Sequence, residues 1–135
     1  MNITPDLKSD GNFYPCFLSA DGNTLILYLD DEFNSDIYLI RLENNRCATP
    51  KKLNKNINSI DHETFASLST DGKTIYFVSD RKGGFGGLDI YKSTFNEKEN
   101  DWGEAINLGR EVNTPFNEET PIMCEDGKTL FFSSQ

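Results

Sequence analysis

The sequence has 135 residues, of which 36% are hydrophobic and 12% aromatic, and its 22 acidic and 13 basic side chains give a formal net charge of -9. This length suits one domain of ordinary size, and the abundance of Phe, Tyr, Asn, Asp and Gly favours an all-β fold with many turns. The acidic balance, without a sizeable basic cluster, argues against nucleic-acid binding, and no apolar run reaches the ~18 residues of a membrane-inserted helix.

The first third of the chain is predicted to form a small antiparallel sheet. Residues 1–12 are polar and are expected to form a lead-in loop. The strands that follow are expected at residues 13–18, 25–29 and 36–42, with a shorter fourth near Leu53. Asp21 and Gly22 favour a tight turn between the first two strands, because Gly tolerates a positive φ and the Asp carboxylate accepts hydrogen bonds from turn N–H groups. The second strand is apolar at consecutive positions, so both of its faces should be covered.

The same order of elements then returns twice. A second set of four strands is expected at residues 64–68, 75–78, 88–95 and 102–108, with its turn at Asp71 and Gly72. A third set begins at Glu118, turns at Asp126 and Gly127, and stops after its second strand. The three turns lie 50 and 55 residues apart, and the additional residues fall in loops, as expected for a repeated supersecondary unit. The Asp and Gly residues of all three turns are therefore predicted to determine the fold rather than to catalyse a reaction.

A repeat of four strands, with a second strand covered on both faces, is typical of a β-propeller blade. A β-sandwich would leave one face in water and would show strict alternation instead. We therefore predict an all-β, incomplete β-propeller of about two and a half blades, each a four-stranded antiparallel sheet. The blades are expected at residues 13–58 and 59–113, with the first half of a third at 114–135. Because a propeller closes with about four to eight blades, the chain should belong to a longer propeller or complete a ring as a homo-oligomer.

The repeats carry a family resemblance. Residues 118–134, which contain the third turn, resemble the TolB-type, WD-like β-propeller repeat, and so do residues 64–80. The longer pattern of residues 83–119, with a Gly-rich loop and the pair Asp101-Trp102, is similar to the version found in cell-envelope proteins of Bacteroidetes-like bacteria. There the propeller accompanies tetratricopeptide repeats and an OmpA-like peptidoglycan-binding domain. The resemblance implies a non-enzymatic module that binds or scaffolds proteins, in the periplasm or at the outer membrane, although the polar start of the chain is not a signal peptide.

The connections that lead into the innermost strands hold the candidate binding residues. His62 and Glu63 lie on the first such connection, and Asn117 and Glu118 are their counterparts in the next repeat. In a propeller these connections lie near the rim of the central channel, where ligands often bind. The four residues are therefore predicted to contact a ligand. The alternative is that these polar side chains only solvate the loop. No nucleophile accompanies them in a recognisable setting, so no catalytic residue is predicted.

The sequence predicts no metal site and no cofactor. In the first repeat, Asp30, Glu32, Asn34 and Asp36 alternate as in a calcium loop. However, Ser35 stands where such a loop needs Gly, and the final bidentate Glu is missing.

Two further features have explanations other than catalysis. The Gly-rich residues 83–87 lack the following helix and the Lys-Ser/Thr pair of a phosphate-binding loop, so we predict a flexible turn between two strands. Three cysteines without a Cys-x-x-Cys pair argue against a disulfide framework and a structural zinc site. Cys16 and Cys124 are expected to be buried thiols and Cys47 to lie in a loop.

Two other functions stay open at this point. The chain could belong to the accessory propeller of a hydrolase, such as a prolyl-oligopeptidase-like peptidase, whose catalytic domain is not in these residues. It could also offer a carbohydrate-binding surface built on Trp102 and the acidic loops, although Trp102 is expected to pack against a blade. The Asp-Gly turns are similar to the Asp box of sialidases as well, but the arginine cluster that binds the substrate carboxylate in such enzymes is missing.

Overall fold

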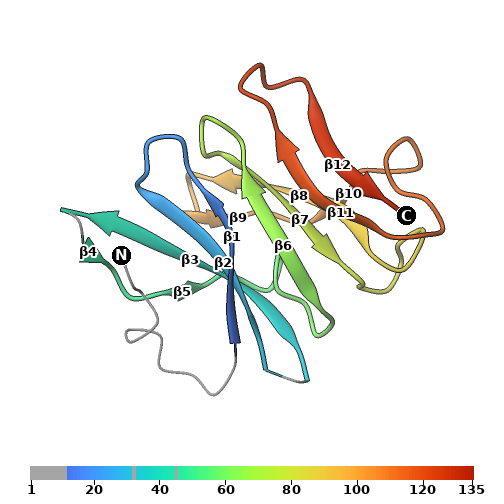
Figure 1. Ribbon diagram of the computed structural model, residues 1–135, viewed down its shortest axis with the longest axis horizontal. Helices are drawn as coiled ribbons and strands as arrows, with labels where there is room; N and C mark the ends of the chain where they lie inside the picture. Colours follow the sequence, from blue (N-terminus) through green and yellow to red (C-terminus); the bar gives the residue numbers. More distant parts are fainter. Residues whose placement is uncertain (1–11, 32, 45) are drawn as a thin grey trace.

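The computed structural model describes residues 12–31, 33–44 and 46–135. The predicted lead-in loop, apart from Asn12, lies outside these residues. The described chain forms three antiparallel sheets that follow one another side by side in sequence order (Figure 1). No helix in this part of the chain is long and apolar enough to cross a bilayer.

The first sheet is a meander in which each long strand pairs with the one before it. Its three long strands are β1 (Asn12–Leu18), β2 (Thr24–Asp30) and β3 (Ser35–Glu43). Two short strands, β4 (Arg46–Cys47) and β5 (Lys51–Lys52), both pair with β3 and together take the place of the predicted fourth strand. The outer edge is therefore built in two pieces.

The second sheet repeats this plan. Its strands are β6 (Glu63–Leu68), β7 (Thr74–Ser79), β8 (Asp89–Asn96) and two short outer strands on β8, β9 (Asp101–Trp102) and β10 (Ile106–Asn107). The third sheet consists of β11 (Glu118–Met123) and β12 (Leu130–Ser134). The predicted fold class, all-β with antiparallel blades and a final half blade, is thereby confirmed. The blade boundaries placed in the connections stay a prediction.

The core lies between the sheets, because β6 packs against β2 and β3, and β11 packs against β6 and β7. The neighbouring residues Phe77 and Val78 of β7 point to opposite faces of the sheet, and both are fully buried. This double burial explains why the second strand of each blade is apolar at consecutive positions. Ile26 and Ile37 of the first sheet join Ala66 of the second in one hydrophobic cluster.

The three Asp-Gly turns lie at the same end of the molecule (Figure 1). In the second turn, the Asp71 carboxylate accepts hydrogen bonds from the Ser69 hydroxyl at 2.6 Å and from the Lys73 N–H at 3.0 Å. Gly72 has a φ of 71°, which a side chain would disfavour. The first turn repeats these bonds, whereas the third has Cys124 in place of Ser. There the carboxylate bonds to the side chain and backbone of a Thr instead.

Replacing Asp71 with alanine is expected to lower the melting temperature at pH 7. The hydrogen bond from Ser69, followed by that from the Lys73 N–H, holds the pKa of Asp71 below its ordinary value. The stabilisation from the ionised carboxylate is therefore present above the ordinary pKa and is lost as the pH falls through the lowered one. Thermal unfolding should show a difference between wild type and Asp71→Ala that shrinks towards pH 2, while Glu99→Ala, at an exposed position, should change little. Loss of a ligand's affinity without a change in melting temperature would contradict a structural role.

No disulfide joins the three cysteines, all of which lie in the described part of the chain and are partly exposed. Cys16 and Cys124 are thus half-buried rather than fully buried as predicted, and Cys47 lies in β4 rather than in a loop. Burial still raises the pKa of the Cys16 thiol to about 11. At neutral pH this thiol is protonated and a poor nucleophile.

Candidate functional site

Two connections of similar build lie at the end of the molecule opposite the Asp-Gly turns. Residues 53–62 lead from the first sheet into β6, and residues 108–117 lead from the second sheet into β11. We call them the rim connections, because each one enters the first strand of the next sheet. The four candidate binding residues lie at their ends.

Each rim connection is fastened to its own sheet by a buried asparagine. The Asn58 carboxamide accepts from the Ile37 N–H at 2.6 Å and donates to the carbonyls of Ile37 at 2.9 Å and Leu53 at 3.0 Å. Asn113 makes the equivalent pair of bonds to Ile90, at 2.7 Å and 2.9 Å. The repeat spacing aligns the two asparagines in the sequence, and this signal could have identified them.

Glu63 and Glu118 follow the asparagines by five residues, and both are fully buried. The Glu63 carboxylate accepts hydrogen bonds from the Ser59 N–H at 3.0 Å, the Ser59 hydroxyl at 2.6 Å and the Ser79 hydroxyl at 2.7 Å. Glu118 receives the same three kinds of bond, from the N–H and hydroxyl of Thr114 and from the Ser134 hydroxyl. Both carboxylates are therefore occupied by the chain itself.

Arg81 distinguishes the first of these two carboxylates from the second. Its guanidinium donates to Glu63 Oε1 at 3.2 Å and to the carbonyls of Asn56 and Ile57. It also lies 5.0 Å from the ring centroids of both Phe77 and Tyr91. One side chain thus ties a rim connection to the second sheet through charge, hydrogen bonds and ring contacts.

The two buried carboxylates have opposite pKa shifts. Desolvation raises the pKa of Glu63, and the hydrogen bonds from Ser59 and Ser79 and the charge of Arg81 only partly oppose it. Desolvation also acts to raise the pKa of Glu118, but the bonds from Thr114 and Ser134 outweigh it and leave the pKa lowered. Glu63 lies deeper, because sheets pack on both sides of β6.

His62 and Asn117 hold neighbouring loops. The His62 N–H donates to Asp80 Oδ1 at 2.7 Å, and its Nδ1 lies 3.2 Å from Asp80 Oδ2. Asn117 Oδ1 accepts from the Leu88 N–H at 2.9 Å. All four candidate residues thus lie at one end, on connections into adjacent strands, but of these only the His62 side chain is substantially open to solvent. Their ligand contacts stay a prediction.

The Gly-rich loop at residues 83–87 packs against the second rim connection rather than standing free. The N–H groups of Phe85 and Gly86 donate to the Asp89 carboxylate, and the Gly87 N–H donates to the Phe116 carbonyl at 3.2 Å. A Cβ on Gly86 would lie 2.2 Å from that carbonyl oxygen. The glycine therefore allows a close approach between two parts of the backbone, which explains the sequence without a phosphate ligand.

Large apolar side chains are exposed at the tips of the loops at this end. Ile60 is 90% exposed, Phe33 is 87% exposed and Phe116 is 66% exposed. A bridge between Ser35 and His62 brings the loop of Phe33 beside the first rim connection. We call Phe33, Ile60 and Phe116 the rim patch. The sequence signal for the patch was available, since each residue is an isolated apolar position inside a polar loop.

The remaining sequence candidates have bonds within the chain. Trp102 is 6% exposed and packs edge-on against Phe95, with ring centroids 5.3 Å apart, so neither face of its indole is open to a sugar. In the calcium-like loop, Asp36 forms an ion pair with Lys52 at 2.7 Å, and Glu32 lies outside the described residues. Among the residues that the structure describes, no cluster of His, Cys, Asp and Glu could hold a metal ion.

The fold has a counterpart among solved structures. The chain is similar to the crystal structure of TolB from Acinetobacter baumannii, with a TM-score of 0.62 and 24% sequence identity, covering 90% of this chain and 26% of that chain. The chain therefore spans about a quarter of the length of that protein. No family model and no curated protein matches the sequence. The likeness supports the β-propeller fold described above.

Proposed function

We propose that this chain is a non-enzymatic β-propeller segment that binds a protein partner through the rim patch, as part of a protein of the bacterial cell envelope. The observation that carries the proposal is the exposure of three large apolar side chains at one end of the molecule. Large aromatic and aliphatic side chains exposed at loop tips are suited to anchoring in a protein partner. The periplasmic or outer-membrane location rests on the resemblance to envelope proteins that carry this repeat.

The shape of this surface favours a protein over a small molecule. Ile60, Phe33 and Phe116 project from loop tips, whereas a small-molecule site is usually a concave pocket. The buried carboxylates of Glu63 and Glu118 are held by bonds within the chain, which leaves them unavailable as a catalytic acid and base. The arrangement is thus suited to binding rather than chemistry.

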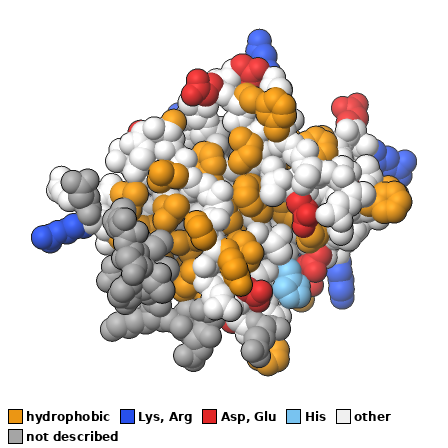
Figure 2. All heavy atoms as spheres, viewed as in Figure 1, with side chains coloured by type: hydrophobic (Ala, Val, Ile, Leu, Met, Phe, Trp, Pro, Cys, Tyr) orange, Lys and Arg blue, Asp and Glu red, His pale blue; other side chains and the backbone are white. Residues whose placement is uncertain are grey.

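Further blades would extend the rim and would cover apolar side chains that are exposed on the strands. Figure 2 shows hydrophobic side chains gathered over the middle of the face on which β1, β6 and β11 lie in Figure 1. On these strands Tyr14, Leu18 and Ile122 are exposed, and on β12 so are Phe131 and Phe132. Within the described residues β12 pairs only with β11. We expect more strands, from further sequence or from other copies, to cover this edge and to extend the rim around a channel.

Photo-crosslinking from the rim patch tests the proposal. The substitution Ile60→benzoylphenylalanine should give a discrete crosslinked protein in cells that produce the chain, and adding Phe116→Ser should reduce the yield several-fold. Truncating an anchoring aromatic side chain typically costs about 2 kcal/mol of binding free energy or more. Lys98→benzoylphenylalanine, at the opposite end, is the matched control. Equal crosslinking from both positions, or none from position 60, would refute the proposal.

A further inference from the structure

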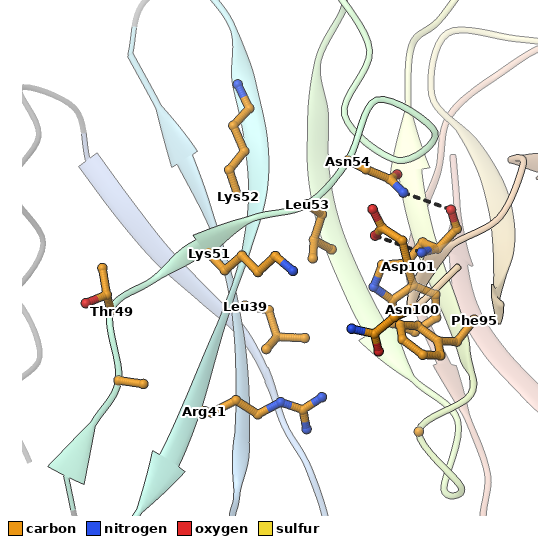
Figure 3. Close-up of a pocket in the computed structure, with 13 residues that line it drawn as sticks. Leu39, Arg41, Thr49, Lys51, Lys52, Leu53, Asn54, Phe95, Asn100 and Asp101 are labelled. Carbon is orange, nitrogen blue, oxygen red and sulfur yellow. Dashed lines mark hydrogen bonds between the residues drawn. The ribbon is translucent and has the colours of Figure 1, made fainter. Parts of the chain in front are cut away.

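A groove of about 430 Å³ lies between the first two sheets, away from the rim patch (Figure 3). Apolar side chains from both sheets line its inner part: Leu39, Leu53, Phe95 and Trp102. The side-chain amides of Asn54 and Asn56 both donate to the Trp102 carbonyl at 2.8 Å, which fixes one sheet against the other. Contacts between the first two sheets alone thus form the groove, and no further blade is needed to build it.

Two cationic side chains project into this groove from the first sheet. Lys51 of β5 pairs with Leu39 of β3, and Arg41 lies two residues further along β3, so all three share one face of the sheet. Figure 3 shows Lys51 and Arg41 pointing towards Asn100, whereas Lys52 points away. Lys52 is neutralised by its ion pair with Asp36.

Neither cation in the groove has a charged partner within the described chain. The Arg41 guanidinium makes one hydrogen bond, to the Thr24 hydroxyl at 3.0 Å, and no ion pair or hydrogen bond of the described residues engages the Lys51 ammonium. The one carboxylate in the lining, Asp101, accepts a hydrogen bond from the Trp102 N–H at 2.9 Å. Arg41 and Lys51 outnumber this carboxylate, so in a protein with a net charge of -9 the groove is a local site of small positive charge with an apolar floor.

We propose that this groove binds an acidic peptide segment of a partner protein. Carboxylates of the peptide pair with Arg41 and Lys51, and an adjacent aromatic or aliphatic side chain packs on Phe95 and Leu39. Strand β5 lies at the edge of its sheet, so an extended peptide can also bond to its backbone. A nucleic acid is a poorer occupant, because the net charge of -9 disfavours a long polyanion, whereas a short peptide places only a few carboxylates at the two cations.

The single tryptophan provides the test, because Trp102 lines the groove and its fluorescence should respond to an occupant. The probe is the peptide acetyl-Glu-Phe-Asp-Phe-Glu-amide, titrated into the full chain. Lys51→Gln and Arg41→Gln should each weaken binding about tenfold, since each removes a charge-assisted contact. Lys82→Gln makes the same change of charge at the opposite end and should leave the affinity unchanged. The affinity of the wild type should also fall with added salt.

Three results would overturn the proposal. The first is equal binding of the charge-reversed peptide acetyl-Lys-Phe-Lys-Phe-Lys-amide. The second is no saturable change in fluorescence with either peptide at millimolar concentration, confirmed by peptide-observed NMR. The third is self-association that Lys51→Gln abolishes in analytical ultracentrifugation, which would make a second copy of this chain the occupant. The groove is separate from the rim patch, so none of these results bears on the proposed rim interaction.

Discussion

Replacing Arg81 with alanine is expected to destabilise the protein by about 3–5 kcal/mol, because it leaves the carboxylate of Glu63 buried without its cation. The loss extends beyond the ion pair. The guanidinium also satisfies the carbonyls of Asn56 and Ile57 and lies between the rim connection and the ring of Phe77. Chemical denaturation at pH 7, followed by far-UV circular dichroism, would measure the difference in unfolding free energy.

The pH dependence separates this effect from a simple loss of packing. A raised pKa means that folded Glu63 holds its proton more tightly than the unfolded chain does, so ionisation costs stability as the pH rises past the ordinary Glu value. Without Arg81 that pKa rises further, and the deficit of Arg81→Ala should grow from pH 4 to pH 7.

Two further variants sharpen the measurement. Arg81→Lys keeps the charge but loses the planar guanidinium with its several N–H donors. Its unfolding free energy should therefore lie between those of wild type and Arg81→Ala. Arg110→Ala removes an exposed arginine that lies 5.6 Å from the centroid of the Phe85 ring and should cost less than about 1 kcal/mol. A loss for Arg81→Ala that is small and independent of pH would show that the ion pair does not stabilise the fold.

The repeated hairpins were predictable because their signals are local. Asp71-Gly72 and its two counterparts fix turns within a few residues, and the apolar runs after them mark strands covered on both faces. The outer strands were harder to predict, since β5 and β10 have two residues each. A periodic pattern cannot be recognised over so short a length. Their pairing with β3 and β8 depends on packing between sheets rather than on the residues themselves.

The position of the candidate residues at the start of a strand was predictable, but the burial of their side chains was not. The repeat spacing put His62 and Glu63 where a rim connection enters a strand, and the structure has them there. The sequence could not indicate that Glu63 is buried, because Ser79 and Arg81 reach it from 16 and 18 residues away. The groove could not be predicted for the same reason, because Lys51 and Trp102 line one groove only once two blades have packed.

The second large effect is expected at Asn58, whose replacement by alanine should cost about 3 kcal/mol. The substitution leaves the buried N–H of Ile37 and the carbonyl of Leu53 without their partner, and each such group typically costs about 1–3 kcal/mol. The Ile37 carbonyl loses one of its two bonds and keeps the one from the Leu53 N–H at 3.1 Å. Asn58→Asp keeps the acceptor for the Ile37 N–H but sets a carboxylate against two carbonyl oxygens. It should therefore lower the unfolding free energy more than alanine does at pH 7, and stability should recover in acid.

Asn113→Ala should lower the unfolding free energy somewhat less than Asn58→Ala, because the third bond of Asn113 is to the partly exposed side chain of Asn107, which can bond to water. Urea unfolding compares these variants with Lys55→Ala, an exposed change on the same connection that should stay within about 0.5 kcal/mol. If Asn58→Ala behaves like Lys55→Ala, the rim connection is held by its apolar residues alone, and the asparagine does not fix it.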